Sequence, residues 1–318
     1  MTTNRQPAYA ARPRAKKILR TARHIGRDYQ LYLLFIPVLA YYVLFHYLPM
    51  YGLRIAFMDY SIIKGFSKSP YVGFAQFEKL FSSPYFLVSL KNTLVLSLYT
   101  LLAGLPFPIL FALILNSIRD GRFKKVVQTV SYAPHFISTV VIVGMIKLFL
   151  SPTSGIFNTV IVALGGEAIN FMAHPQMFPH IYVWSGIWQN LGWDAILYIA
   201  ALGAVDPQLH EAAQLDGAGR FKRILYIDLP SILPTIMIIL ILKIGSVLSV
   251  GFEKVYLMQN NLNAAASETI ATYTYKQGLE EARYSYSSAT GLFNSVVNVV
   301  MLITFNALSK RMTESSLW

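Results

Sequence analysis

The polar and aromatic side chains between residues 181 and 202 are of the types that bind sugars. This otherwise apolar stretch holds Trp188, Asn190 and Asp194, beside two further tryptophans and a glutamine. On a helix, residues four apart share a face, which places Asn190 beside Asp194. Sugars offer apolar C–H faces to aromatic rings and hydroxyl groups to amides and carboxylates, so this mixture suits a saccharide path. The other interpretation is that the tryptophans anchor the chain at a membrane boundary.

Lys147 and Lys243 lie inside apolar stretches, where an ammonium group is costly unless it reaches water or an acid. Exposure to lipid at the bilayer centre costs roughly 3 kcal/mol or more. Lys147 lies near the end of its stretch and is expected to extend toward the interface, whereas Lys243 lies nearer the middle of its own. We therefore expect Lys243 to face a water-lined interior, where it would favour an anionic sugar such as a uronate-containing oligosaccharide.

Catalytic and metal-binding patterns are missing from the sequence. It contains no cysteine, which excludes thiolate chemistry and zinc–thiolate sites. It contains no Gly-Lys dipeptide either, so it cannot carry the GxxxxGK[ST] loop that cradles nucleotide phosphates. His174 and His180 are six apart, which is not the spacing of two metal ligands on one helix face. We expect no catalytic residue, no metal site and no cofactor in this chain.

A polar loop between two apolar stretches carries a second pattern. Residues 207–215 predict a short helix, because Pro207 suits a first helical position and Glu211 follows in an early turn. Gly217 then ends that helix, since glycine tolerates the left-handed conformation with which helices often end. Small alanines would let the backbone of another protein approach closely, with the Glu211 carboxylate at the edge of the contact. The residues of this pattern are Glu211, Ala212, Ala213, Asp216, Gly217, Ala218, Ile227, Leu229 and Pro230.

The spacing of these residues resembles the cytoplasmic signature of binding-protein-dependent ABC import permeases. Glu211, Ala212 and Ala213 precede the glycine, and after nine further residues the chain reads Ile-Asp-Leu-Pro at 227–230. In that family the loop docks in a cleft of the ATP-binding subunit and transmits nucleotide-driven closure to the membrane helices. The resemblance implies a type I importer permease fold that is not itself an enzyme, with ATP and magnesium bound by partner subunits.

The same resemblance implies the remaining partners and the kind of cargo. It implies a second, homologous permease, a dimer of ATPases and an extracytoplasmic solute-binding protein, working by alternating access in a bacterial inner membrane. Residues 71–94 look like the entry to the second span of carbohydrate permeases. Residues 251–260 lack the Gly-Gly-Pro turn of many sugar permeases and, with motifs farther along, resemble the branch that carries complex oligosaccharides and polysaccharide fragments.

Other interpretations of the loop and of the chain have weaker support. The loop could be an ordinary connection whose alanines only favour helix, and Asp216 and Arg220, four apart, could simply pair with each other. An ion-gradient-driven transporter or channel would need a relay of buried carboxylates, but Asp194 is the one acid that we place inside a span. A membrane-embedded enzyme would need a nucleophile and a base, and no such pair is evident.

Composition requires the elements around these residues to be mostly membrane helices. Of the 318 residues 55% are hydrophobic and only 13% are charged, which is far more apolar than a soluble domain. Lipid offers the backbone no hydrogen-bond partners, so each span must be helical and about 20 residues long. Prolines such as Pro106 and Pro134 predict either packing kinks or hinges in these spans. We expect an all-α integral membrane protein with six transmembrane helices near residues 31–51, 89–115, 133–150, 181–202, 234–250 and 289–308.

The distribution of charge predicts the orientation. With the N-terminus inside, the inner segments carry 17 Lys and Arg residues and the outer loops carry 7, which places both termini in the cytoplasm. Because the net charge of +12 follows the loops rather than a soluble patch, nucleic acid is not an expected partner. The basic arm could be topogenic charge near anionic lipid or bind a specific partner. The expected parts are a cytoplasmic arm at 1–28, a permease domain at 29–310 with a coupling loop at 206–230, and a cytoplasmic tail at 311–318.

Overall fold

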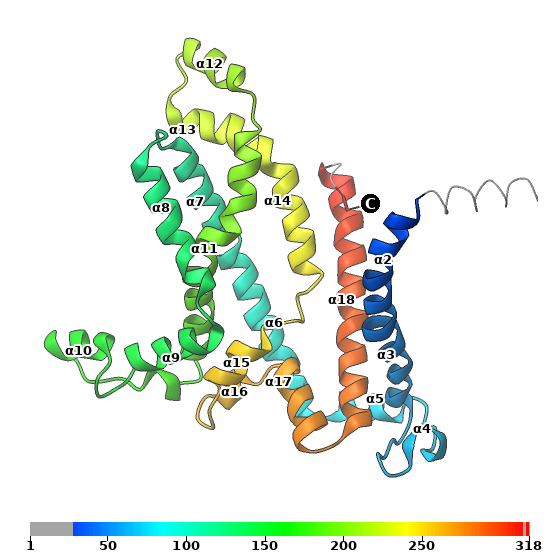
Figure 1. Cartoon of the computed structure of the whole chain (residues 1–318). Helices are drawn as coiled ribbons and strands as arrows, with labels where there is room; N and C mark the ends of the chain where they lie inside the picture. The colour runs from blue at the N-terminus through cyan, green and yellow to red at the C-terminus, as the bar shows by residue number, and fades with distance from the viewer. Residues whose placement is uncertain (1–27, 314–315, 318) are drawn as a thin grey trace, which may run out of the picture. The chain divides into compact units, whose positions relative to one another are not determined.

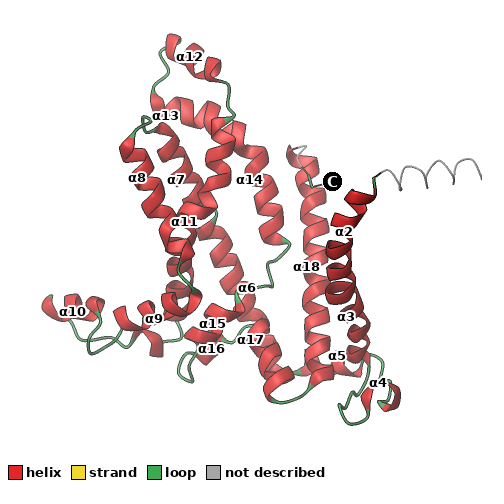
Figure 2. Cartoon of the chain, viewed as in Figure 1, coloured by secondary structure: helices red, strands yellow, loops and turns green. Residues whose placement is uncertain are grey.

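The computed structural model describes residues 28–313 and 316–317, and the regular elements in that part of the chain are helices (Figures 1 and 2). The expected basic arm lies almost wholly outside the described residues. The chain divides into two compact units, Met1–Arg54 and Ile55–Trp318, and each is described by itself. The absence of sheet beyond an isolated bridge between Met58 and Tyr71 agrees with the all-α expectation for the described residues.

The described part of the first unit is one nearly continuous helix. It consists of α2 (Tyr29–Tyr42), the π-helical turn η1 (Val43–Tyr47) and α3 (Leu48–Met50), and the 3₁₀ turn η2 (Tyr51–Phe57) leads into the second unit. An 18-residue window within Tyr29–Phe57 has a mean hydropathy of 1.8, and the stretch is long enough to cross a membrane. It contains the first expected span.

The second unit begins with two short helices and then a long apolar pair. The short ones are α4 (Gly65–Lys68) and α5 (Ala75–Ser82), followed by α6 (Pro84–Gly104) and α7 (Pro106–Ser117). Ser83 caps α6 by accepting a hydrogen bond from the backbone N–H of Phe86. Pro106 stands in the first turn of α7, where a missing N–H costs little. Together α6 and α7 form the second expected span.

The third expected span is wrong as a single helix. Residues 133–150 divide between the 3₁₀ turn η3 (Ala133–Phe136) and α9 (Thr139–Phe149). The stretch Arg122–Phe136, which includes α8 (Arg122–Tyr132), is bent by 98° from α9. Pro134 removes a backbone donor at the break, and the Ser138 side chain caps the new helix by accepting from the Val141 N–H. This stretch therefore consists of two helical segments at a large angle, where hydropathy alone predicts one straight helix.

The fourth expected span is the central helix of the second unit. After α10 (Ile156–Ala163) and η4 (Phe171–Ala173), α11 runs from Met177 to Gly203. Its polar residues lower its mean hydropathy, so α11 is not among the helices that hydropathy alone identifies as spans. Within the described residues four helical stretches are long and apolar enough to cross a membrane, or five if the bent pair is one span, so the expected count of six is not reached by this measure.

The remaining elements complete the second unit. The polar loop folds as α12 (Pro207–Leu215), α13 (Arg220–Arg223) and the π-helical turn η5 (Ile224–Asp228), which continues into α14 (Leu229–Ile244). Four short elements follow, and a long last helix carries the sixth expected span. These are α15 (Phe252–Met258), α16 (Ala264–Ser267), α17 (Ile270–Tyr275), η6 (Lys276–Glu280) and α18 (Tyr284–Thr313).

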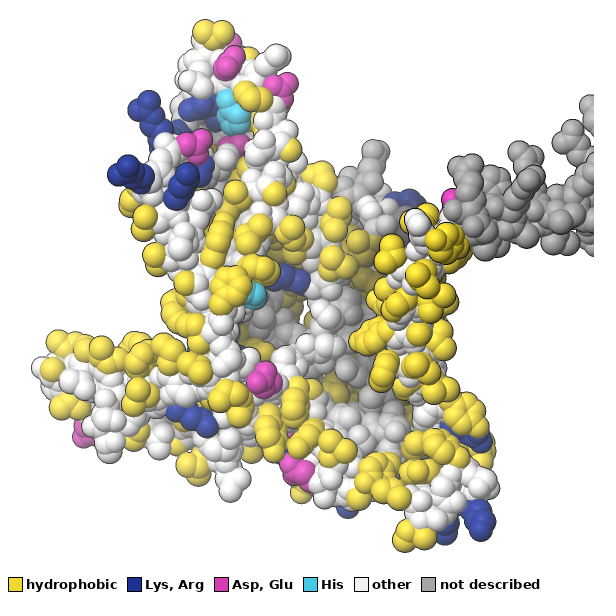
Figure 3. Space-filling model, in the orientation of Figure 1, with side chains coloured by type: hydrophobic (Ala, Val, Ile, Leu, Met, Phe, Trp, Pro, Cys, Tyr) yellow, Lys and Arg dark blue, Asp and Glu magenta, His cyan; other side chains and the backbone are white. Residues whose placement is uncertain are grey.

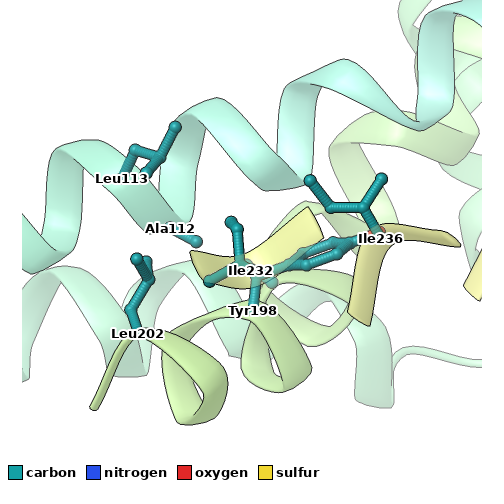
Figure 4. Packing of buried hydrophobic residues seen from close by; sticks show 7 residues of the cluster. Ala112, Leu113, Tyr198, Leu202, Ile232 and Ile236 are labelled. Carbon is teal, nitrogen blue, oxygen red and sulfur yellow. The ribbon is translucent and has the colours of Figure 1, made fainter. Parts of the chain in front are cut away.

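Helices α7, α11 and α14 share a hydrophobic core, part of which is drawn in Figure 4. Helix α11 also packs closely on α8: a Cβ added at Gly192 would lie 2.4 Å from the Ser131 carbonyl oxygen. Small residues of this kind let membrane helices approach each other without a polar side chain between them. The core thus fixes α11, which carries the polar candidates, against its neighbours. Its buried members are Ala112, Leu113, Ala195, Tyr198, Leu202, Ile232 and Ile236.

Candidate functional site

The loop helix α12 begins as its sequence predicts. The Asp206 side chain accepts a hydrogen bond from the Gln208 N–H at 2.9 Å, and Pro207 occupies the first turn. Glu211 and Ala212 are exposed, and Ala213 is partly exposed. The helix therefore presents small side chains and one carboxylate at the end of the second unit where α13 also lies (Figure 1).

The end of α12 is a glycine-terminated cap. Gly217 has a φ of +77°, the left-handed conformation that other residues avoid. The Ala218 N–H donates to the Ala213 carbonyl at 2.8 Å, and the Gly217 N–H donates to the Gln214 carbonyl at 3.0 Å. These two bonds are the Schellman pattern that satisfies the last carbonyl groups of a helix. The glycine of the motif thus has a conformational reason to be there.

The second half of the motif forms the junction with the membrane helix. Ile227 lies in the π-helical turn η5, and Leu229 and Pro230 open α14. Pro230 stands in the first turn, where its missing N–H is tolerated. No ion pair joins Asp216 to Arg220, both of which are described residues, so the simple pairing considered from their spacing is not observed.

A contact that the sequence reasoning missed joins the two halves of the motif. His210 Nε2 lies 3.3 Å from Asp228 Oδ1, although the angles do not make this a hydrogen bond. Asp228 is 4% exposed, and the Nε of Arg223 is buried nearby without a hydrogen-bond partner. The available signal was the placement of a histidine immediately before the Glu-Ala-Ala sequence and of an acid between Ile227 and Leu229.

Basic side chains gather around α13 and the start of α8, near α12, as Figure 3 shows for one face. One of them is compensated: Lys124 Nζ lies 2.8 Å from Asp120 Oδ1, and this contact lowers the pKa of Asp120 below its ordinary value. Between this end and the opposite one the visible surface over α7, α11 and α14 is mostly apolar. The basic cluster consists of Arg119, Arg122, Lys124, Lys125, Arg220, Lys222 and Arg223.

A cavity of about 310 Å³ brings together three of the four residues expected along a substrate path. Asn190 and Asp194 line it from α11, and Lys243 lines it from α14. Lys243 Nζ donates a hydrogen bond to Asp194 Oδ2 at 3.1 Å, so the lysine faces a partly exposed acid rather than lipid. Asn190 Oδ1 lies 2.9 Å from His135 Nδ1. The polar side chains that lower the hydropathy of α11 thus meet across one cavity.

The tryptophans lie elsewhere. Trp188 is 51% exposed and does not line the cavity. Trp184 donates a hydrogen bond from Nε1 to the Tyr99 hydroxyl at 2.9 Å. The Trp193 ring stacks on the imidazole of His135, with centroids 4.2 Å apart and an interplanar angle of 4°. The structure therefore groups Asn190, Asp194 and Lys243 without Trp188.

Comparison with known proteins decides the family. Residues 104–314 match the family described as binding-protein-dependent transport system inner membrane component, and this match covers the loop, the cavity residues Asn190, Asp194 and Lys243, and α18. The chain belongs to that family. It is therefore a multi-pass inner-membrane permease, as the loop motif predicts.

Two relatives of this permease from Bacillus subtilis (strain 168) are similar over almost their whole length. Protein LplB is 44% identical over 294 residues, covering 92% of each chain. The polygalacturonan/rhamnogalacturonan transport system permease protein YteP is 44% identical over 288 residues, covering 91% of this chain and 90% of the relative.

Two solved structures share the permease fold. One is a bacterial ABC transporter involved in the import of the acidic polysaccharide alginate, matched with a TM-score of 0.87 and 40% identity over 92% of this chain and 99% of the other. The second is a bacterial alginate ABC transporter in complex with an alginate pentasaccharide-bound periplasmic protein, with a TM-score of 0.86 and 39% identity. That match covers 93% of this chain and 99% of the other, so the type I permease fold extends over nearly the whole chain.

Proposed function

We propose that this permease is the membrane subunit of an ATP-driven importer, and that α12 is the part that couples it to a cytoplasmic ATPase. The proposal rests on an exposed helix that is capped at both ends and presents Glu211 and two alanines to solvent. The same helix contacts the buried Asp228, next to α14, through His210. A helix with small side chains fits a groove closely, and one carboxylate at its edge would bind a basic or amide group of the partner. Because the chain lacks a phosphate-binding loop, the ATP and magnesium would be bound by that partner.

The path from α12 to the cavity runs along α14. His210 meets Asp228 at the start of α14, and Lys243, in the last turn of the same helix, donates to Asp194 of α11. A helix transmits displacement along its axis because its backbone is hydrogen-bonded along its length, and in α14 the interior Pro234 leaves out one donor. Closure of the ATPase around α12 would therefore tilt α14 and change the contact between α14 and α11. We assign alternating access of the cavity to this movement.

The cargo that suits this cavity is an acidic oligosaccharide, which would pass through it unit by unit. Its polar lining combines amide, carboxylate and ammonium groups, which recognise sugar hydroxyls and uronate carboxylates. Support comes from the relatives, because YteP is a polygalacturonan/rhamnogalacturonan permease and both solved structures are alginate transporters. Trp188 is left as a candidate for a part of the path outside this cavity.

The expected partners are a second, homologous permease, two ATP-binding subunits and an extracytoplasmic solute-binding protein. The alginate transporter that was solved with its periplasmic protein is an assembly of this type. The excess of basic residues around α13 and the start of α8 favours a cytoplasmic location for the α12 end. This orientation places both termini in the cytoplasm.

Coexpression with the neighbouring genes tests the proposal. We expect an ATPase to copurify with the chain, and Glu211→Arg to abolish either this association or the hydrolysis of ATP that accompanies transport. The control is Glu167→Arg, which makes the same charge change at another exposed glutamate, in the loop after α10, and should leave the association intact. Solute uptake by the chain without ATP, or equal behaviour of the two variants, would reject the coupling role of α12.

A further inference from the structure

One face of α11 lines the cavity in a regular row. Tyr182, Gly186, Asn190 and Asp194 recur every four residues and all four line it. Residues at this spacing form a nearly continuous stripe along one side of a helix. Lys254 of α15 closes the row from the other side, opposite Gly186. The row gives a sugar chain several polar contacts along one line.

Lys243 does not supply free positive charge to this cavity. Its ammonium group lies 3.1 Å from the Asp194 carboxylate, and both side chains are about equally exposed, at 38% and 34%. The pair is therefore close to neutral as a unit, and an incoming anion would meet the acid as well as the base. Another lysine of the cavity is therefore a better candidate than Lys243 for attracting an anionic sugar.

Lys254 is the remaining lysine of the cavity. Its Nζ donates a hydrogen bond to the Tyr182 carbonyl at 3.1 Å and lies 5.1 Å from the centroid of the Tyr182 ring. Among the described residues no carboxylate comes within ion-pair distance of it. A Cβ on Gly186 would lie 3.4 Å from Nζ, so the glycine leaves room for the ammonium group beside α11. Burial without a counter-ion lowers the pKa of Lys254 to about 8.

A partly buried ammonium group that lacks an ion-pair partner is stabilised when a ligand brings a carboxylate. Carbonyl and aromatic-ring contacts satisfy part of its hydrogen-bonding capacity, but they do not neutralise its charge. A carboxylate in the cavity would do so with a charge-assisted hydrogen bond. The cavity volume of about 310 Å³ is at the lower end of small-molecule sites, which suits a unit of a sugar chain rather than a whole oligosaccharide.

We propose that Lys254 is the specificity-determining residue for acidic cargo, and that its ammonium group binds the carboxylate of a uronate unit as it passes the α11 row. The inference rests on the proposed function, because it assigns a substrate contact within that transport path. A second cavity of about 200 Å³ shares Thr100, Tyr182 and Lys243 with the first and is lined by several hydroxyl groups. These hydroxyls would accompany the neutral parts of the same sugar chain, and they belong to Ser97, Thr100, Ser246 and Ser249.

The test compares one substrate in two charge states. Trigalacturonate and its fully methyl-esterified form have the same sugar chain, but only the first carries carboxylates. Uptake of each is measured in proteoliposomes that contain the complete transporter with its binding protein. Each variant is compared with the wild type for the same substrate, so that the selectivity of the binding protein cancels.

We expect Lys254→Met to reduce uptake of trigalacturonate about tenfold, as loss of a charged hydrogen bond implies, and to change uptake of the ester less than about twofold. Lys254→Arg should restore most of the acidic uptake because it keeps the charge. The matched variant Lys243→Met leaves Asp194 without its partner and should affect both substrates alike.

Three results would overturn the assignment. They are equal loss of both substrates in Lys254→Met, a selective loss of acidic uptake in Lys243→Met instead, and a wild type that carries the ester but not the acid. Failure of the proposed function looks different, because uptake by the wild type would then not depend on ATP for either substrate.

Discussion

His210 in the exposed helix α12 lies 3.3 Å from Asp228 in the π-helical turn that leads into α14. Asp228 is 4% exposed, so a buried point on the membrane helix is attached to the exposed loop helix. At the far end of α14, Lys243 is bonded to Asp194 of α11. The two contacts give α14 one polar attachment near each end, and in the proposed coupling displacement of α12 reaches the cavity through them.

Asp228→Asn tests the first attachment. The amide has almost the same shape as the carboxylate but carries no negative charge with which to attract the His210 side chain. We expect the ATPase to copurify as before, and substrate-stimulated ATP hydrolysis to fall roughly fivefold or more, since a coupling free energy of about 1 kcal/mol corresponds to that factor. The measurement is ATP hydrolysis by the purified complex with and without substrate.

Asp120→Asn is the control for that experiment. Asp120 forms an ion pair with Lys124 at 2.8 Å, but its side chain is fully exposed, and pairs of this kind contribute little. We expect no change in coupling. An equal loss in both variants would mean that negative charge near the loop matters and that the His210 contact does not.

Gly217→Ala tests the cap of α12. The residue has a φ of +77°, and a side chain there costs about 1–2 kcal/mol. We expect the end of α12 to loosen, so that limited proteolysis cuts the loop faster and less ATPase copurifies. Gly219→Ala is the control because Gly219 has a φ of −67° and nothing within 4 Å of an added Cβ. Equal proteolysis of the two variants would contradict a conformational role for Gly217.

The sequence predicted the loop well because its signals are local. A proline at the start and a left-handed glycine at the end each act within a few residues, and the helix α12 begins and ends where they indicate. The match of residues 104–314 to the permease family confirms the interpretation of the spacing. The surface that would bind Glu211 belongs to another chain, so the docking of this residue stays a prediction.

The features that the sequence did not predict depend on contacts between distant segments. The bend of 98° between the stretch that ends at Phe136 and α9 leaves no hydropathy signal, because the two arms taken together are still apolar enough to read as one span. The bond from Lys243 to Asp194 joins helices 49 residues apart in the chain. Trp188 was grouped with Asn190 by composition, but two positions on a helix differ by about 200° in direction, which places it off the cavity face.

Gly192→Leu tests the close packing of α11 on α8. An added Cβ would lie 2.4 Å from the Ser131 carbonyl oxygen, so the helices would have to separate. Overpacking of this kind costs about 1–3 kcal/mol, and we expect the midpoint of thermal unfolding in detergent to fall by about 5 °C or more. Gly203→Leu, near the end of the same helix with nothing within 4 Å, should leave the midpoint almost unchanged. Equal midpoints in the two variants would contradict the packing.

The pH dependence of uptake tests the charge on Lys254. Burial lowers its pKa to about 8, so the ammonium form predominates below that pH and is lost as the pH rises through it. The groups that line the same cavity are Tyr182 and Asp194 from α11 and Lys243 from α14, and α9 packs on α15 through apolar side chains. We expect uptake of trigalacturonate to fall between pH 7 and 9 by about tenfold, because at pH 9 only about a tenth of the lysine is charged.

Lys254→Arg separates this effect from other titrations in the assembly. Arginine stays protonated throughout that range, so the fall in uptake should disappear in the variant while the binding protein and the ATPase are unchanged. The methyl ester should show the same shallow profile in both proteins, since it carries no carboxylate for the ammonium group to bind. A fall of the same size in Lys254→Arg would assign the titration to a different group and leave Lys254 without a part in the pH dependence.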